Sequence, residues 1–202
     1  MSELSPMMRH YIELKEKYKD CILFYRLGDF YEMLFDDAIL ASRELEIVLT
    51  GRDCGLPERA PMCGVPYHSA QNYIDRLIAK GYKVAICEQL SDPAKSKGLV
   101  ERDVIRVVTP GTVVDTASVA ENENNYLLSL CVADGHVGLA YTDVSTGAFY
   151  VSECAADEGF ASVLGEVARI QPREIIYRAE DAAVIDALNT AIKDQNIFVS
   201  EY

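Results

Sequence analysis

Residues 22–32 read ILFYRLGDFYE, and this stretch decides the first part of the fold. The apolar residues before Gly28 predict a buried strand, because β-branched and aromatic side chains favour extended backbone. Gly28 then marks a break, since glycine adopts conformations that other residues avoid. If the chain is extended again, period-two alternation puts Phe30 and Glu32 on one face of a strand and Tyr31 on the other.

Two interpretations of that ring and carboxylate stay open. A flat apolar side chain beside a hydrogen-bonding carboxylate is suited to prying at a base stack. A phenylalanine at a strand end is more commonly part of the core, and Phe-x-Glu is frequent by chance.

The surrounding sequence predicts a mixed α/β domain. Ser5 is a good N-cap, Pro6 is a good first helical residue, and apolar residues at helical spacing predict a helix over 6–18. The other elements predicted here are a strand at 21–27, a helix from Asp36 to about Glu46, a strand at 47–50, a loop at 51–60, a helix from Ser69 to Gly81, a strand at 83–88, a basic loop at 91–101 and a strand at 104–108.

A different order of elements follows a linker-like stretch between about 109 and 125. The predicted elements are strands at 126–133, 137–144 and 148–151, a helix from Asp157, a strand at 175–177, a helix from Asp181 and the beginning of a strand at 196–202. This is the opening order of the ribonuclease H-like α/β fold. We therefore predict a first domain at 1–112, a linker at 113–125 and a truncated second domain at 126–202.

The net charge of −13 opposes simple nucleic-acid binding, because neutralisation of phosphates drives most of that affinity. The charge is unevenly distributed. Residues 1–115 hold 15 of the 19 Lys and Arg against 18 acids, whereas residues 116–202 hold 4 against 14 acids. The asymmetry favours a DNA-facing first domain and a protein-facing second domain.

The six cysteines are scattered without a Cys-x-x-Cys pair, and several lie in apolar runs. Reduced thiols in the cytoplasm are the simplest interpretation, and no metal site is expected. No apolar run approaches the ~18–20 residues of a membrane span, and the start has no secretory pattern. We expect no membrane association.

An enzyme finds little support in the sequence. Two-metal phosphodiester cleavage needs converging carboxylates, one of them normally inside the first strand, and 126–133 contains none. Asp143, near the end of the next strand, has no obvious companion. No Gly-x-x-x-x-Gly-Lys-Ser/Thr phosphate loop occurs, and the three histidines are far apart in the sequence. We predict no catalytic residue in this chain.

Five blocks stand in one order and spacing between about Pro6 and Thr112. They are FYRLGDFYEMLFDDA at 24–38, PMCGVPYH at 61–68, VAICEQ at 84–89, DP at 92–93 and VTPGT at 108–112. Together they closely resemble the MutS family of bacterial DNA mismatch repair proteins, and a weaker likeness continues to the end. The resemblance implies a mixed-sheet α/β mismatch-recognition domain followed by a truncated ribonuclease H-like connector domain.

For the first domain, the resemblance implies that Phe30 enters the minor groove and stacks on a mispaired or unpaired base, while Glu32 hydrogen-bonds that base. Glu32 either accepts a hydrogen bond from the base or is itself protonated and donates one. Leu27 is a possible contact at the deformed step, and the possible phosphate contacts are Arg52, Lys95, Lys97, Arg102 and Arg106. An ordinary core role for Leu27 and a solvated surface role for each basic residue fit the sequence equally well.

For the whole protein, the resemblance implies a homodimeric ATPase that uses ATP and Mg²⁺ and recruits a MutL-like partner, partly through the connector domain. The ATPase domain lies outside this chain, so no cofactor is expected here and DNA binding by the fragment should be weak. The alternative is a protein-interaction module whose ring no longer serves DNA.

Overall fold

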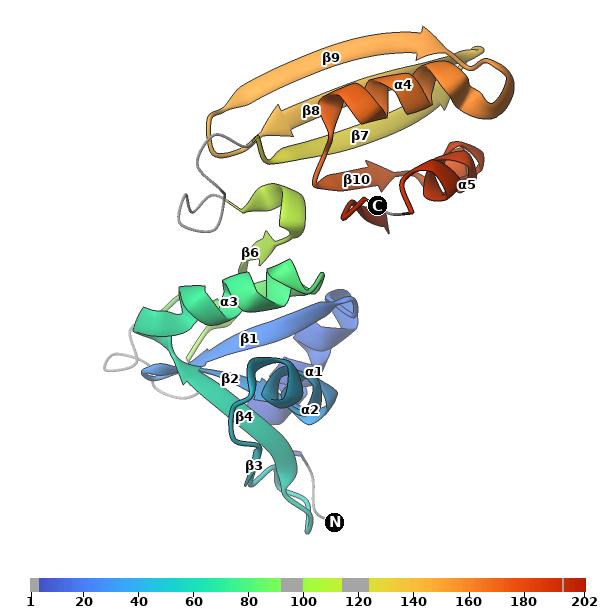
Figure 1. Cartoon of the computed structure of the whole chain (residues 1–202). Helices are drawn as coiled ribbons and strands as arrows, with labels where there is room; N and C mark the ends of the chain where they lie inside the picture. Colours follow the sequence, from blue (N-terminus) through green and yellow to red (C-terminus); the bar gives the residue numbers. More distant parts are fainter. Residues whose placement is uncertain (1–3, 92–99, 114–123, 194) are drawn as a thin grey trace. The chain divides into compact units, whose positions relative to one another are not determined.

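The computed structural model describes residues 4–91, 100–113, 124–193 and 195–202. The chain forms two compact units, Met1–Val108 and Thr109–Tyr202. Each unit is built on its own mixed sheet with helices packed against it (Figure 1), so the predicted α/β class is confirmed. Within the described ranges, no helix has the length and apolar character needed to cross a membrane.

The sheet of the first unit has six strands in the order β3-β4-β2-β1-β5-β6. β1 and β5 are parallel, and the other neighbours are antiparallel. The strands are β1 Cys21–Leu27, β2 Phe30–Leu34, β3 Thr50–Arg52, β4 Ala60–Pro66, β5 Lys83–Gln89 and β6 Arg102–Val108. The strands predicted at 21–27, 83–88 and 104–108 are therefore confirmed to within two residues.

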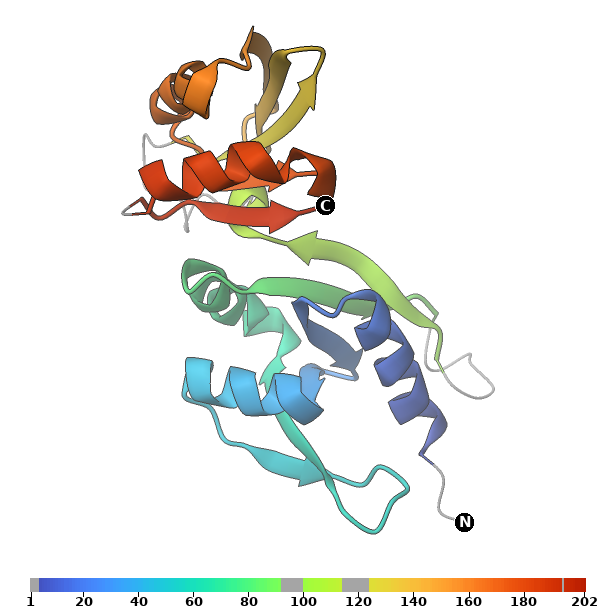
Figure 2. The ribbon, with the colours of Figure 1, turned by 90° about the vertical axis from the view of Figure 1, so that its right-hand side faces the viewer.

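Helices cover both faces of this sheet. α1 (Pro6–Lys17) lies on one side, and α2 (Phe35–Leu45) and α3 (Ala70–Ala79) lie on the other (Figure 2). The predicted cap of α1 is present, because the Ser5 Oγ accepts a hydrogen bond from the Met8 N–H at 3.4 Å. α3 begins directly after Ser69, as predicted, but the Ser69 side chain makes no cap bond to the helix.

A buried carboxylate joins α1, α2 and β1. The Asp37 Oδ2 accepts hydrogen bonds from the Tyr11 hydroxyl at 3.1 Å and from the Leu23 N–H at 3.0 Å. The Lys15 Nζ lies 2.8 Å from the Asp37 Oδ1. Burial first, and the nearby Asp37 charge second, raise the pKa of Tyr11 well above its usual range, so its hydroxyl remains a donor. Asp37 thus ties α1, α2 and β1 together at one point.

Two predictions between α2 and α3 are wrong. The strand predicted at 47–50 lies further along as β3, because the chain leaves α2 through Glu46 in a left-handed conformation (φ +57°). The loop predicted at 51–60 is therefore shorter. β4 was not predicted, since its sequence APMCGVP contains two prolines and a glycine. Its buried residues still alternate at Cys63 and Val65.

The second unit has a five-stranded sheet in the order β11-β10-β7-β8-β9. β7, β8 and β9 form antiparallel pairs, while β10 runs parallel to both β7 and β11. The strands are β7 Tyr126–Ala133, β8 His136–Asp143, β9 Ala148–Ala155, β10 Glu174–Tyr177 and β11 Phe198–Glu201. This is the strand arrangement of ribonuclease H-like folds, in agreement with the order predicted from the sequence.

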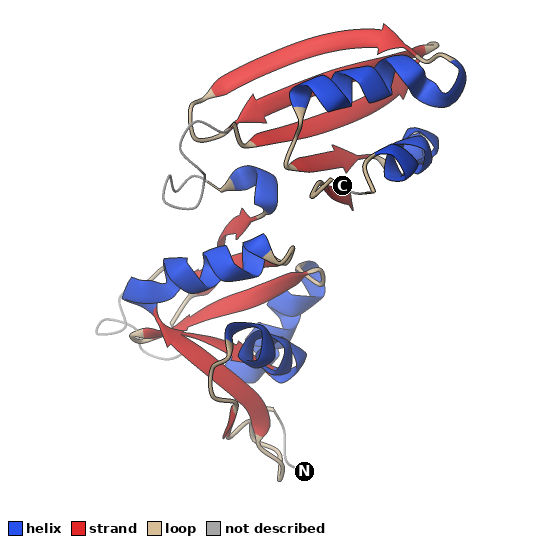
Figure 3. Ribbon diagram, viewed as in Figure 1, coloured by secondary structure: helices blue, strands red, loops and turns tan. Residues whose placement is uncertain are grey.

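α4 (Ala161–Ile170) and α5 (Ala182–Ala191) share one hydrophobic core with β7, β8 and β10 (Figure 3). Two boundaries differ from the prediction. β9 continues to Ala155, four residues beyond the predicted end, and Asp157 is followed by a 3-10 turn at Glu158–Phe160 before α4 begins. The sequence hides the length of β9, because its last residues, SECA at 152–155, lack the large apolar side chains typical of a strand.

The segment before the second sheet packs on the second unit. The Gly111 N–H donates to the buried Glu174 Oε2 at 2.9 Å, and a Cβ at Gly111 would lie 2.9 Å from the Glu174 Cβ. The Asn125 Nδ2 donates to the Val113 carbonyl at 3.3 Å. Residues 109–113 therefore fold with the second unit. Most of the linker predicted at 113–125 lies outside the described residues, so those boundaries stay a prediction.

Candidate nucleic-acid interface

Phe30 stands at the tip of the β1–β2 hairpin. The register pairs Tyr25 with Glu32 and Leu27 with Phe30, so only two residues form the turn. Gly28 opens that turn with φ +59°, the conformation that a glycine adopts without strain. The predicted alternation is confirmed, because Phe30 is 48% exposed while its neighbour Tyr31 is buried. The fold therefore holds an apolar ring in solvent at a fixed place.

The turn is held by groups from distant parts of the chain. The Tyr67 N–H donates to the Asp29 carbonyl at 3.0 Å. The Arg26 guanidinium lies 3.6 Å from the centre of the Tyr67 ring, and its Nε donates to the Gly28 carbonyl at 2.5 Å. The Arg26 Nη1 also lies 3.4 Å from the Glu88 carboxylate. These bonds fix both turn carbonyls.

Tyr31, on the opposite face of β2, reaches the same carboxylate. Its hydroxyl donates to the Glu88 Oε1. Burial, followed by the hydrogen bond to Glu88, raises the pKa of Tyr31 to about 12, so the hydroxyl keeps its proton. The sequence patterns did not reveal the roles of Arg26 and Glu88, since an arginine at a strand end and a glutamate in a strand carry no local sign of a shared partner.

Glu32 and Arg52 form an ion pair beside the ring. The Arg52 Nη1 donates to the Glu32 Oε2 at 2.5 Å. Glu32 lies opposite Gly64 on β4, and a Cβ at Gly64 would lie 3.5 Å from the Glu32 Cγ and 3.2 Å from the Tyr31 carbonyl. Because glycine has no side chain, Glu32 and the Tyr31 carbonyl can lie close to the β4 backbone at Gly64. A carboxylate and a guanidinium are thus presented together beside Phe30.

An open groove of about 570 Å³ adjoins this group. Its lining residues come from β2, from the chain after α2, from β3 and from β4, and they include Phe30, Glu32, Val48, Thr50, Met62 and Gly64. Val48 is an exposed apolar residue in a connecting segment. The surface around the ring is therefore partly apolar.

The other predicted contacts have different surroundings. Leu27 is half-buried against the core, and Arg106 is exposed on β6. Arg102 is only 8% exposed, and its guanidinium donates to the carbonyls of Arg26 and Val100 and to the Gln89 side chain. Arg102 therefore supports the hairpin from within the protein, and a phosphate contact by Arg102 stays a prediction. Lys95 and Lys97 lie outside the described residues.

The second unit offers no assembled nuclease site in its described part. Asp143 Oδ1 accepts hydrogen bonds from Ser145 and Thr146, and its Oδ2 accepts one from the Asn125 N–H. Burial alone would raise the pKa of Asp143, but these hydrogen bonds lower it. Asp143 shapes a turn, and no group of three or more metal-ligating side chains occurs among the described residues.

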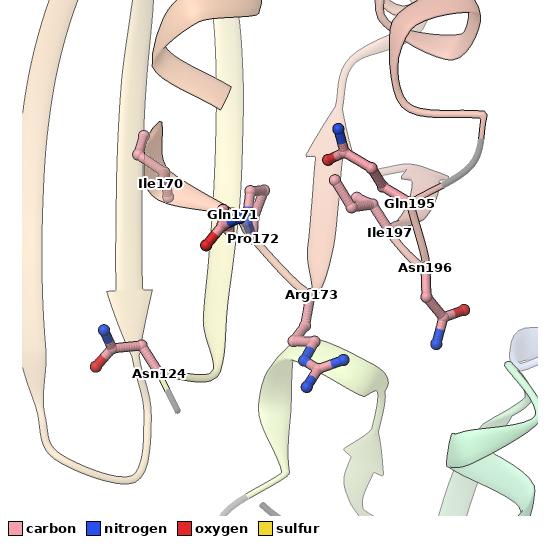
Figure 4. A pocket seen from close by; sticks show the side chains of 8 residues that line it. All are labelled: Asn124, Ile170, Gln171, Pro172, Arg173, Gln195, Asn196 and Ile197. Carbon is pink, nitrogen blue, oxygen red and sulfur yellow. The ribbon is translucent and has the colours of Figure 1, made fainter. Parts of the chain in front are cut away.

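A hollow of about 420 Å³ in the second unit is lined by polar and apolar residues (Figure 4). They come from the chain before β7, from the end of α4 and the residues that follow it, and from the chain before β11. The side chains of Gln195 and Asn196 point away from each other, and Arg173 points away from Gln195 (Figure 4). Because these groups do not converge, the hairpin of the first unit is the stronger candidate site.

The fold and the hairpin define a two-domain α/β protein with an aromatic ring and a carboxylate side by side on the surface of its first unit. Comparison with known proteins gives the family. The family model described as "MutS domain I" matches residues 5–117, and the one described as "MutS domain II" matches residues 125–201. The chain belongs to the MutS family.

Curated relatives carry the name DNA mismatch repair protein MutS. The relative from Acetivibrio thermocellus is 59% identical over 180 residues, which are 89% of this chain and 21% of the relative. The relative from Alkaliphilus oremlandii is 50% identical over 204 residues, which are 100% of this chain and 23% of the relative. The chain thus spans about a fifth of the length of these relatives.

Proposed function

We propose that this chain recognises mismatched or unpaired bases in double-stranded DNA, with Phe30 as the side chain that enters the minor groove. The observation that carries the proposal is the exposed phenyl ring at the tip of a braced hairpin. Membership of a mismatch repair family supports the same function.

The ring would read how easily a base step deforms. Inserting an apolar side chain costs a few kcal/mol of unstacking, and a mispaired step costs less than a matched one. A braced hairpin serves this role because the turn does not have to be ordered when DNA binds. The ring then stays only where the stack is already weak.

Glu32 would add a test of the base itself. A carboxylate near the DNA backbone is repelled, so it favours binding only where a base offers a hydrogen-bonding partner. A matched pair offers no spare group at that place. Glu32 would therefore oppose the binding of matched DNA and favour a mispair that offers it a hydrogen bond.

Phosphate contacts would position the duplex without reading its sequence. The proposed contributors are Arg52 and Arg106, together with Lys95 and Lys97 outside the described residues, while Leu27 would pack beside the deformed step. Each phosphate contact should make the slope of log affinity against log salt concentration more negative by about 0.9.

We also propose that the chain acts within a longer homodimeric ATPase in the cytoplasm, and that the second unit takes part in binding a MutL-like partner. The chain contains no Gly-x-x-x-x-Gly-Lys-Ser/Thr loop, so its own residues do not fit the phosphates of ATP in that way. ATP and Mg²⁺ would bind elsewhere in the longer protein. All six cysteines are free thiols, which supports a reducing compartment.

The test is a fluorescence anisotropy titration of the protein, as produced from its gene, with a G·T duplex and its matched counterpart at one stated salt concentration. We expect tighter binding of the G·T duplex. Glu32→Gln should keep or raise affinity for the matched duplex by a few-fold, because about 1 kcal/mol of repulsion is removed. The preference for G·T should therefore narrow. Equal binding of the two duplexes by the wild type would overturn the proposal and favour a protein-interaction module.

A further inference from the structure

Arg52 holds the carboxylate that the proposed function assigns to the base. Its Nη1 lies 2.5 Å from the Glu32 Oε2, and the two side chains are 35% and 13% exposed, respectively. The pair is therefore within reach of solvent and of an approaching duplex. A base that hydrogen-bonds Glu32 therefore approaches a carboxylate that already forms an ion pair with Arg52.

The strand arrangement lets Arg52 change partners without moving the hairpin. β3 is a three-residue strand at the edge of the sheet, and β4 separates it from β2. Arg52 pairs with Ala60 on β4, whereas Glu32 pairs with Gly64. The two side chains meet across the intervening strand, so turning the arginine outward breaks no strand pairing.

The exchange replaces one anionic partner of Arg52, the Glu32 carboxylate, by another, a DNA phosphate. A guanidinium binds a carboxylate and a phosphate with the same fork of donors, so a DNA phosphate can replace Glu32. A partly exposed ion pair is weak and does not oppose that replacement strongly. Removal of Arg52 leaves the Glu32 charge without its cation beside a polyanion, unless a base donates a hydrogen bond to it.

We propose that Arg52 is a specificity-determining residue that leaves Glu32 for a DNA phosphate only where a mispaired base takes its place on the carboxylate. This inference rests on the proposed function. The exchange couples the contact of Glu32 with a base to the contact of Arg52 with a phosphate. A phosphate contact carries no sequence information by itself. Through this coupling it strengthens binding at a mispair and not at a matched pair.

The experiment combines Arg52→Gln and Glu32→Gln, singly and together, in the protein as produced from its gene. Affinities for G·T and matched duplexes are measured across a salt series. Arg59→Gln is the control for lost positive charge, because Arg59 lies in the same connecting region and forms an exposed ion pair with Asp53 at 3.2 Å. A thermal unfolding curve for each variant checks that the fold is intact.

With Glu32 present, Arg52→Gln should weaken G·T binding about five- to tenfold through the lost phosphate contact. It should weaken matched binding by a smaller factor, because the Glu32 charge is then uncompensated beside the polyanion. The slope of log affinity against log salt concentration should become less steep by about 0.9 for the G·T duplex alone. With Glu32→Gln, Arg52→Gln should weaken both duplexes to the same extent. Arg59→Gln should change both affinities alike.

Three outcomes would overturn the exchange. An equal loss on both duplexes in the presence of Glu32 would make Arg52 an ordinary phosphate contact. An unchanged salt slope with lost discrimination would make the ion pair a static support of Glu32. Equal binding of both duplexes by the wild type would overturn the exchange and the proposed function together, whereas the first two outcomes leave the proposed function standing.

Discussion

Phe30 and Phe149 are both exposed on strands, yet their surroundings differ. Phe30 is 48% exposed at a hairpin that Arg26 and Tyr67 hold in place, and the Glu32–Arg52 pair lies beside it. Phe149 is 66% exposed on β9, an edge strand, with Thr142 as its cross-strand partner. Exposure alone therefore does not separate the two rings; a rigid support and nearby polar groups make Phe30 the stronger candidate for binding.

Charge sharpens the same contrast. Residues 116–202 carry 4 basic residues and 14 acids, so the strand that bears Phe149 belongs to an acidic unit. A strongly acidic surface repels a polyanion. The exposed aromatic and apolar residues of β9 suit contact with protein better than contact with DNA.

The largest expected effect is on mismatch binding. Phe30→Ala should weaken binding of a G·T duplex by about 1–3 kcal/mol, the range found when an aromatic side chain stacked on a base is removed. Phe149→Ala removes the same ring from the other unit and should leave affinity unchanged. Anisotropy titrations of both variants at one salt concentration give the comparison, and similar losses from the two variants would contradict it.

A smaller effect is expected from two strand glycines. Gly64→Ala should lower the free energy of unfolding by about 1 kcal/mol, because its Cβ would lie 3.2 Å from the Tyr31 carbonyl and the neighbouring strand must shift. Gly138→Ala should change stability by less than about 0.5 kcal/mol, since its nearest contact would be the Cys131 carbonyl at an ordinary 3.8 Å. Urea unfolding of both variants measures the difference.

Gly64→Ala should also reduce discrimination between G·T and matched duplexes, because a shift of the strand at the Tyr31 carbonyl displaces the next residue, Glu32. Gly138→Ala should not. If Gly64→Ala lost stability but kept full discrimination, the close approach at Gly64 would matter for packing alone.

The smallest effect concerns stability at low pH. The Arg178 guanidinium lowers the pKa of Asp181 against the opposing effect of burial, and the Val132 N–H lowers it further. A carboxyl whose pKa is lowered by folding stabilises the fold above its unfolded pKa near 3.9, and that contribution is lost as pH falls through the folded value. The second unit should therefore lose stability below about pH 4.

Asp181→Asn should flatten this dependence in unfolding curves recorded between pH 7 and pH 2.5. Asp20→Asn in the first unit is the comparison, since Lys83 lowers the pKa of Asp20 but the Asp20 side chain is largely exposed. A steeper acid dependence after Asp181→Asn would mean that the ion pair with Arg178 does not stabilise the second unit.

Local patterns predicted most elements of both units. The apolar run of β1 and the cap of α1 are read from neighbouring residues, and the structure has both. β4 escaped prediction because Pro61, Gly64 and Pro66 are typical of loops, and only pairing with β2 and β3 makes this segment a strand.

The candidate site shows the same division. Alternation along β2 predicts that Phe30 and Glu32 share a face, because that depends on neighbouring residues alone. The contacts of Arg26 with Tyr67 and Glu88, and the burial of Arg102, depend on residues brought together from distant parts of the chain. No spacing rule applies to such contacts, so a buried structural arginine and a surface arginine look alike in the sequence.

The hydrogen bond between the Gly111 amide and the buried Glu174 carboxylate decides where the second unit can be separated from the first. A piece cut at Tyr126 would keep Glu174 and lose its amide donor, leaving a carboxylate in the interior without that partner. A piece that starts at Thr109 retains the donor. Contacts of Gly111 and Asn125 thus place the natural point of division ahead of the sheet, and Gly111 lies some fifteen residues before its first strand.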